Sequence, residues 1–108
     1  MNYLNDLKNI PSKEMFPGYT GRFIHTNNMT FAFWEVKAGS RVPEHAHMHE
    51  QVAHIMEGQF ELTVDGQPLL LEAGKVAVIP SNIKHSGVAV TDCKLLDVFT
   101  PVREDYRI

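Results

Sequence analysis

The segment QFELTVDGQPLLL, residues 59–71, carries the pattern that decides the fold class. Phe60, Leu62 and Val64 alternate with polar residues, and a period of two places successive side chains on opposite faces of a β-strand. The dipeptide Asp65-Gly66 then gives a strong signal for a two-residue hairpin turn. The segment therefore predicts two antiparallel strands joined by a tight turn.

Short segments of the same kind lie on both sides of this hairpin. Glycines and asparagines interrupt them at intervals that are typical of an antiparallel sandwich or barrel. A helix is expected only over residues 3–9, because Pro11 would end it. The fold class is therefore all-β, with further strands expected at residues 20–26, 29–37, 51–57, 75–80, 85–91 and 93–99.

Length and composition limit the domain organisation. A chain of 108 residues, 44% of them hydrophobic, has room for one domain with one core. We therefore assign residues 1–108 to a single domain, with an N-terminal arm at 1–18, a barrel at about 20–100 and a C-terminal tail at 101–108. Cys93 is the only cysteine, so the chain cannot form an internal disulfide, and its apolar neighbours suggest an inert thiol.

The charge pattern narrows the class of partner. The net charge of -3 arises from acidic and basic residues that are interleaved along the chain, without a basic stripe. This pattern argues against nucleic acid as a partner and favours small solutes. No run approaches the roughly 20 apolar residues of a membrane span, and the first residues do not resemble a secretion signal. We therefore expect a cytoplasmic protein with no membrane partner.

The segment PEHAHMHEQ, residues 43–51, suggests a metal site. His45 and His47 are two apart, so on a strand both imidazoles would project into the barrel toward one ion. Gln51 has the same parity and would reach the ion from the neighbouring strand, beyond a bend. His85, near the start of a later strand, is the natural fourth ligand.

Each histidine also has an ordinary structural interpretation. A single histidine in a strand is more often a hydrogen-bonded or surface residue than a ligand, and only the joint pattern favours the metal. His49 lies in the expected bend, where it would face solvent or support the ligands. His25 and His54 are expected to have structural or surface roles. Glu50 competes with Gln51 as a ligand, but its parity is opposite to that of the paired histidines.

The spacing of the first motif resembles that of the cupin superfamily. Gly39 is followed by five residues and His45, one residue and His47, three residues and Gln51, and six residues and Gly58. Gln51 stands where the superfamily usually has glutamate. Counting back six residues from the closing glycine also selects Gln51 over its acidic neighbour as the ligand.

A second cupin motif is also present. Gly74 is followed by five residues and Pro80, and His85 comes five positions later. Asn82 and Ala89 depart from the usual glycine and asparagine, at turn and scaffold positions. The resemblance implies a double-stranded β-helix, or jelly roll, with a divalent metal ion inside.

A glutamine ligand changes the charge of such a site. Three neutral imidazoles and a neutral amide leave the full +2 charge of the ion, whereas a glutamate would reduce it to about +1. A stronger Lewis acid is suited to polarising a carboxylate or enolate oxygen, more than to supporting the higher oxidation states of oxygenase chemistry. Ligation by nitrogen and oxygen suits Mn, Fe, Co, Ni or Zn.

The last expected strand adds a possible catalytic group. Asp97 and Phe99 share one face, and if that face is the inner one, the pKa of the carboxyl can be tuned for proton transfer. Arg103 follows just beyond Pro101 and could fold over the mouth to clamp a substrate carboxylate. Alternatively, the charged residues after Pro101 form a solvated tail with mutual ion pairs, and Asp97 pairs with the backbone.

A narrower resemblance favours the catalytic interpretation. The run HAHMHEQ, residues 45–51, and the run DVFTPVREDY, residues 97–106, resemble the small single-domain cupins of the KdgF-type pectin-degradation family. The similarity spans roughly residues 20–106 and implies an isomerase that opens 4,5-unsaturated monouronates to linear 4-deoxy-5-ketouronate. The metal ligands implied by the resemblance are His45, His47, Gln51 and His85, and the catalytic residues are Asp97, Phe99 and Arg103.

The residues suggest a role for each group in that reaction. Asp97 would move the proton, and Arg103 would neutralise the carboxylate of a carboxylated sugar. Phe99, with Trp34 or Phe33, would pack on the sugar face and limit water. A metal-dependent small-molecule dioxygenase and a non-catalytic sugar-binding cupin remain as alternatives.

Exposed edge strands predict the assembly. Small jelly rolls commonly cover such edges by pairing with a second copy, so we expect a homodimer. The segment Met15-Phe16-Pro17 is the candidate for a swapped or packing element.

Overall fold

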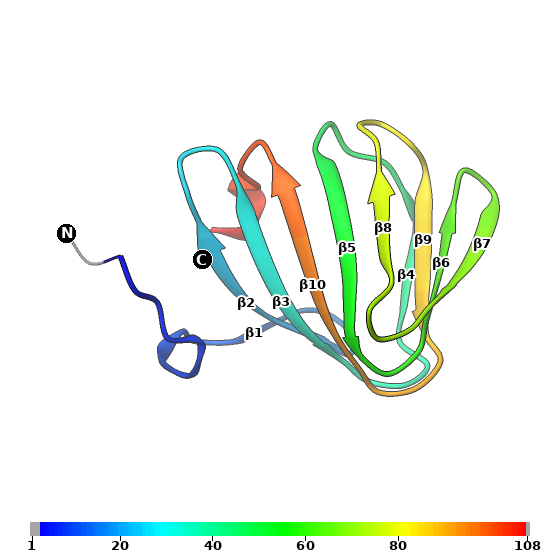
Figure 1. Cartoon of the computed structure of the whole chain (residues 1–108), viewed down its shortest axis with the longest axis horizontal. Helices are drawn as coiled ribbons and strands as arrows, with labels where there is room; N and C mark the ends of the chain where they lie inside the picture. The colour runs from blue at the N-terminus through cyan, green and yellow to red at the C-terminus, as the bar shows by residue number, and fades with distance from the viewer. Residues whose placement is uncertain (1–2, 108) are drawn as a thin grey trace.

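The strands form two antiparallel sheets that face each other (Figure 1). The computed structural model describes residues 3–107, so residues 1, 2 and 108 of the single domain that we assigned lie outside the described residues. The six-stranded sheet contains, in spatial order, β1 (Lys13–Phe16), β2 (Tyr19–His25), β3 (Thr30–Val36), β10 (Cys93–Thr100), β5 (Glu50–Glu57) and β8 (Val76–Ile79). The four-stranded sheet contains β4 (Arg41–His45), β9 (His85–Ala89), β6 (Phe60–Val64) and β7 (Gln67–Leu71). This arrangement confirms the all-β jelly roll.

The hairpin at residues 60–71 forms as predicted. Val64 pairs with Gln67, so only Asp65 and Gly66 lie between β6 and β7. Their φ angles are 49° and 79°, the positive values that a tight hairpin turn requires. The local sequence therefore determines both the turn and the register of this pair of strands.

The core lies between the two sheets and is built from alternate residues of each strand. In β3 the residues at positions 30, 32, 34 and 36 are buried and those between them are more exposed. The largest fully buried side chains are Phe99, Ile55, Ile79 and Thr30. Burial of each large apolar side chain contributes about 1.5–3 kcal/mol, so this inner layer supplies most of the stability of the sandwich.

The two ends of the chain differ from the prediction. The helix expected over residues 3–9 is a single 3-10 turn, η1 (Leu7–Asn9), and strand β1 takes up part of the arm that we placed at 1–18. The C-terminal tail packs against the core instead of extending into solvent. After a cis peptide bond at Thr100-Pro101, Val102 and Arg103 are buried, and a second turn, η2 (Glu104–Tyr106), follows.

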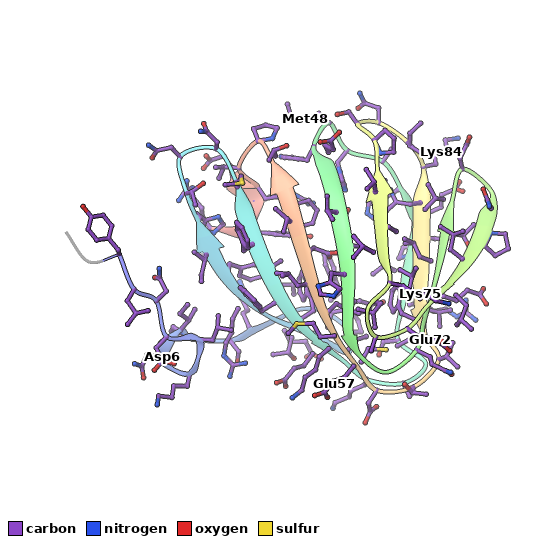
Figure 2. All side chains as sticks on the ribbon, viewed as in Figure 1. Asp6, Met48, Glu57, Glu72, Lys75 and Lys84 are labelled. Atoms are coloured by element: carbon purple, nitrogen blue, oxygen red, sulfur yellow. The ribbon has the colours of Figure 1, made fainter. Side chains whose placement is uncertain are left out.

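The two ends of the sandwich have different surroundings. Met48 lies at the end where the metal motif turns, whereas Glu57 and Glu72 lie at the opposite end (Figure 2). Glu57 and Glu72 form exposed ion pairs with Lys94 and Lys75, each with a nitrogen to oxygen distance of 3.8 Å. Between residues 3 and 107, no helix is long and apolar enough to cross a lipid bilayer.

Candidate metal centre

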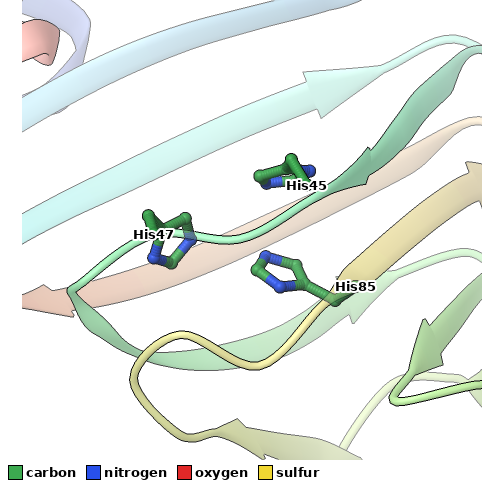
Figure 3. Close-up of side chains that lie close together, drawn as sticks. All are labelled: His45, His47 and His85. Carbon is green, nitrogen blue, oxygen red and sulfur yellow. The ribbon is translucent and has the colours of Figure 1, made fainter.

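Three histidines converge at one end of the sandwich (Figure 3). His45 is the last residue of β4, His47 lies two residues beyond it in the following loop, and His85 is the first residue of β9. His45 and His85 are paired across β4 and β9, and their ring centroids lie 4.3 Å apart. One ring nitrogen from each histidine lies within 4.8 Å of the other two, so a small inward movement lets one ion contact all three.

The loop position of His47 differs from the prediction. We expected His45 and His47 on one strand, but β4 ends at His45, and the pairing with β9 is irregular between Val42 and His45. The ring of His47 still turns toward His85, at a centroid distance of 4.9 Å. The loop, and not the alternation of a strand, therefore brings the second imidazole to the site.

Backbone carbonyls orient the three rings. The Nδ1 atoms of His45, His47 and His85 lie 2.9, 3.0 and 2.9 Å from the carbonyl oxygens of residues 43, 49 and 83. Because a carbonyl oxygen only accepts hydrogen bonds, each Nδ1 carries the proton and donates it. Each Nε2 is left with a lone pair, which is the state that a metal-binding histidine requires.

Two observations test whether these residues fit a cation. His85 Nε2 is buried and has no hydrogen-bond partner, a costly arrangement that a bound ion would relieve. The amide oxygen Oε1 of Gln51 lies 3.1 Å from the Nε2 atom of His47, so two lone pairs face each other. A cation that both atoms bind removes this repulsion. The donor set therefore fits a divalent transition-metal ion.

Gln51 belongs to the opposite sheet from two of the histidines. It is the second residue of β5 in the six-stranded sheet and is 8% exposed, whereas β4 and β9 belong to the four-stranded sheet. The four predicted ligands are thus brought together from both layers of the sandwich.

Burial favours the neutral form of two of the imidazoles, those of His47 and His85. Desolvation, together with the positive charge of Arg103, lowers the pKa of His47 to about 4. Desolvation also lowers the pKa of His85. Neutral rings at pH 7 are ready to bind a metal ion without releasing a proton.

Asp97 lies beside these ligands on the inner face of β10. The indole Nε1 of Trp34 donates a hydrogen bond to its Oδ2 atom over 3.1 Å. Burial raises the pKa of Asp97 to about 6, although hydrogen bonds from Gln51 and Trp34 and the charge of Arg103 act in the opposite direction. A carboxyl with this pKa can both accept and return a proton near neutral pH.

Arg103 folds back over the aromatic core. Its guanidinium lies 4.7 Å from the ring centroid of Phe99 and 4.1 Å from that of Tyr106. Asp105 accepts two hydrogen bonds from it, at 3.0 Å from Nε and 2.7 Å from Nη2. The bidentate position that we expected for a substrate carboxylate is thus filled by a carboxylate of the same chain.

The structure changes the expected roles of the aromatic residues. Phe99 is 2% exposed and lies beneath Arg103, so its ring supports the guanidinium from below. Phe33 lies on the outer face of the six-stranded sheet, paired with Leu96, and cannot pack on a molecule inside the barrel. Trp34 faces inward and contacts Asp97, as its parity in β3 indicates.

The remaining histidines lie around or away from the centre. The carbonyl of His49 accepts a hydrogen bond from the ring of His47, and the two rings lie 5.5 Å apart, so His49 lies beside one candidate ligand. His25 pairs with the hydroxyl of Thr30 at 2.8 Å. His54 lies on the outer face of β5.

An open depression of about 450 Å³ lies beside the centre. Met48, His49 and Asp105 are among its lining residues, but His45, His47 and His85 are not. Asp105, which holds the guanidinium of Arg103, thus lies on the wall of this depression. The pair of Arg103 and Asp105 is one of the mutual ion pairs that the sequence allows after Pro101, but the guanidinium is buried in a packed segment and not in a solvated tail.

Comparison with known proteins identifies the family. The family model described as "Cupin domain" matches residues 32–99, which include every predicted metal ligand and Asp97. This chain is a cupin.

Relatives of this cupin include a curated protein of similar sequence. The "Pectin degradation protein KdgF" of Dickeya dadantii is 28% identical over 71 residues, a match that spans 65% of this chain and 64% of the Dickeya protein. The cupin thus resembles KdgF over about two thirds of its own length.

Two solved structures share the fold over nearly the whole chain. An RmlC-like cupin from Shewanella frigidimarina has a TM-score of 0.93 and 26% identity, with 99% of this chain and 97% of that chain covered. The structure of KdgF from Halomonas sp. also has a TM-score of 0.93, at 24% identity, with 99% and 100% covered. At 24% identity, the similarity to the Halomonas protein shows only that the two chains share a fold. The inward-facing side chains of this cupin therefore line a barrel whose architecture is known from solved structures.

Proposed function

We propose that this cupin is a metal-dependent isomerase that opens 4,5-unsaturated monouronates to the linear 4-deoxy-5-ketouronate. One observation carries the proposal: three oriented imidazoles and the Gln51 amide converge beside a half-buried carboxyl whose pKa is about 6. The sequence similarity to the pectin degradation protein of Dickeya supports the substrate class. The ligands would be His45, His47, Gln51 and His85, and the ion Mn, Fe, Co, Ni or Zn.

The reaction is an isomerisation and needs no oxidant or water. The hemiacetal hydroxyl at C1 loses a proton, the bond from C1 to the ring oxygen breaks, and an aldehyde forms at C1. The electron pair remains on the former ring oxygen as an enolate, and protonation at C4 gives the ketone at C5. A bound divalent ion would stabilise negative charge on the substrate oxygens.

The residues of the chain supply the proton transfer and the binding of the carboxylate. Asp97 takes the proton from the hemiacetal hydroxyl and returns it to C4, which a carboxyl of pKa about 6 does readily in both directions. Gln51 and Trp34 hold that carboxyl in place by hydrogen bonds. Arg103 binds the uronate carboxylate as a fork after Asp105 has been displaced from it.

The decisive experiment compares metal content and turnover in the same samples. Unsaturated monouronates made with a pectate or alginate lyase lose their enol-ether absorbance on ring opening, and the ketone product is identified by NMR. We expect Asp97→Asn to keep a full metal content and to lose turnover by about 100-fold or more. Unchanged turnover in that variant would remove Asp97 from the mechanism.

The same samples separate the proposal from its alternatives. Oxygen uptake by the iron-loaded protein would assign a dioxygenase, and Gln51 argues against that chemistry because it leaves the charge of the ion undiminished. Saturable binding of uronates without any loss of absorbance would assign a sugar-binding cupin. A sample that takes up no metal ion under any loading condition would contradict the proposal, because the proposed reaction requires a bound ion.

A further inference from the structure

Thr30 is a polar side chain in the inner layer of the six-stranded sheet. It is the first residue of β3 and is fully buried, with 0% of its surface exposed. A buried hydroxyl gives up its hydrogen bonds to water, so its place in the core requires partners within the protein. Its Oγ1 atom has two such partners, His25 and Arg103. The second of them links the sheet to the C-terminal segment.

The row of residues that contains Thr30 runs to the candidate metal centre. The strand registers pair Thr30 with Phe99, and Phe99 with Gln51, on the inner face of the sheet. Directly paired residues point to the same face, with their Cβ atoms about 5 Å apart. Thr30 therefore lies two strands away from a predicted metal ligand, at the same level of the sandwich.

The hydroxyl of Thr30 holds the backbone of Arg103. The backbone N–H of Arg103 donates a hydrogen bond to Thr30 Oγ1 over 2.9 Å, in a buried contact between residues 73 apart in sequence. Within the turn η2, the carbonyl of Arg103 accepts a hydrogen bond from the N–H of Tyr106 over 3.0 Å. The bond to Thr30 thus ties the segment to the sheet, where the chain turns back from the end of β10 toward β3 (Figure 1).

The other partner of the hydroxyl does not compete with Arg103. His25 Nδ1 lies 2.8 Å from Thr30 Oγ1, and either atom can be the donor, depending on the tautomer of the ring. A hydroxyl has one proton and two lone pairs, so it can donate to His25 or accept from it. In both cases a lone pair remains for the N–H of Arg103. The anchor is therefore independent of the tautomer of His25.

The anchored backbone determines where the guanidinium of Arg103 lies. Its Cζ atom is 4.7 Å from the ring centroid of Phe99 in β10 and 4.1 Å from that of Tyr106 in η2. Because these rings belong to the sheet and to the segment, the guanidinium keeps both contacts while the segment stays docked. Loss of the Thr30 hydroxyl would leave the N–H of Arg103 buried without a partner, a cost that undocking of the segment relieves.

We propose that Thr30 is a positioning residue whose hydroxyl anchors Arg103 and thereby places its guanidinium to bind the uronate carboxylate. The identity of the substrate rests on the proposed function, whereas the anchor rests on the contacts of Thr30 alone. Because the carboxylate does not react, displacement of Arg103 weakens the binding of the substrate and of the transition state alike. Loss of the anchor should therefore change KM and not kcat.

Thr30→Val tests the proposal, because valine keeps the β-branched shape and lacks the hydroxyl. We expect KM for unsaturated monouronates to rise about tenfold, with kcat within about twofold of the wild type and the metal content unchanged. Thr30→Ser retains the hydroxyl and should bring KM back to within about twofold of the wild type. If the valine variant does not fold, Thr30→Ala removes the same hydroxyl and should show the same rise in KM.

Thr91→Val is the matched control for a loss of stability. Thr91 Oγ1 accepts a hydrogen bond from the backbone N–H of Gln59 over 3.0 Å, a bond of the same kind beside Gly58, at the opposite end of the sandwich. This variant should unfold at a lower urea concentration and leave KM unchanged. An equal rise in KM in Thr30→Val and Thr91→Val would overturn the proposal, because the effect would then follow from stability alone.

Hydrogen exchange of the Arg103 amide, followed by NMR, tests the anchor without any substrate. The amide should be protected in the wild type and in Thr30→Ser, and should exchange at least about tenfold faster in Thr30→Val. Equal protection in all three proteins would contradict the anchor, and an unchanged KM in Thr30→Val would contradict the positioning role. A wild type that does not convert uronates would instead refute the proposed reaction, so the two failures are distinguishable.

Discussion

His85 illustrates how the candidate metal centre depends on single side chains. Its Nδ1 proton is committed to the carbonyl of Ile83, and its Nε2 atom is buried without a partner. Replacement by alanine removes a ligand and leaves the ion with fewer donors than a stable site needs. We expect His85→Ala to lose most of its metal content in elemental analysis.

The matched control for that variant is His54→Ala. His54 lies on the outer face of β5, away from the three converging rings, so its loss should leave the metal content unchanged. A full metal content in His85→Ala, or an equal loss in both variants, would contradict the assignment of the ligand.

The neutral amide of Gln51 is predicted to tune the charge of the centre. In Gln51→Glu a carboxylate takes the amide's place beside His47 and lowers the net charge of the loaded site by one. We expect the metal to bind about tenfold more tightly, because the carboxylate attracts the cation. Turnover on uronates should fall by about tenfold, because the ion becomes a weaker Lewis acid. Competition with a chromogenic chelator measures the affinity, and a higher rate of turnover would refute the charge argument.

At the scale of residues, the sequence indicates the candidate ligands but not the backbone contacts that orient their side chains. The spacing of His45, His47 and Gln51 is a local property and can be counted along the chain. The carbonyls that orient the rings depend on how the strands end, and the displacement of His47 into a loop depends on where β4 stops pairing with β9. The pair of Asp105 and Arg103 is local, but the position of the guanidinium over Phe99 and Tyr106 depends on how the tail packs against the core.

Among the structural elements, the C-terminal segment is the one expected to control access to the centre. Arg103 is 9% exposed, and both oxygens of Asp105 accept its hydrogen bonds. A substrate carboxylate must displace Asp105 to bind the same fork. In Asp105→Asn the competing charge is gone, so we expect the KM for uronates to fall several-fold with little change in kcat.

The neighbouring Glu104 offers a control for this prediction. It forms an exposed ion pair with Arg107 at 2.7 Å, and Glu104→Gln should leave KM unchanged. If KM rises in Asp105→Asn, then Asp105 positions Arg103 for substrate instead of competing with it.

Two turns differ in how tightly the chain passes through them. Gly58 and Gly66 both have positive φ angles, of 87° and 79°. A Cβ atom at Gly58 would clash with the backbone carbonyl of Asp92, whereas one at Gly66 would meet only open space. We expect Gly66→Ala to lower the free energy of unfolding by about 1 kcal/mol, from backbone strain alone. Gly58→Ala should cost about 2 kcal/mol more.

Urea unfolding of both variants and the wild type measures these differences. Equal losses would show that the loop at residues 90–92 moves aside without cost, and would contradict the tight passage at Gly58.

Elements with strong local signals are the ones that the sequence predicts well. The hairpin at Asp65-Gly66 is predicted in full because alternation and turn residues agree. Strand β1 is missed, because KEMF shows no clear alternation and its pairing depends on a neighbouring strand. The turn η2 is missed because it follows from the packing of Tyr106 against Phe99 and Phe23.

For the whole molecule, a bound ion should raise the stability of the fold. An ion that binds only the folded state, at a free concentration about 100 times its dissociation constant, adds about 2.7 kcal/mol. In a domain of this size that gain raises Tm by on the order of 10 °C. Calorimetry of the metal-loaded and chelator-treated protein measures the shift. An identical Tm in both samples would show that the ion does not stabilise the folded state.

The placement of the ligands on both sheets has a mechanical consequence. Gln51 extends from the six-stranded sheet, and His45 and His85 extend from the four-stranded sheet, so an ion held by all of them would act as a clasp between the two layers. Separation of the layers at this end would then require the clasp to open first. Amide hydrogens of β5 and β9 should exchange with solvent as one cooperative unit when the clasp is closed and independently when it is open. The proposed metal ion would thus also limit how far the two sheets can separate in the folded protein.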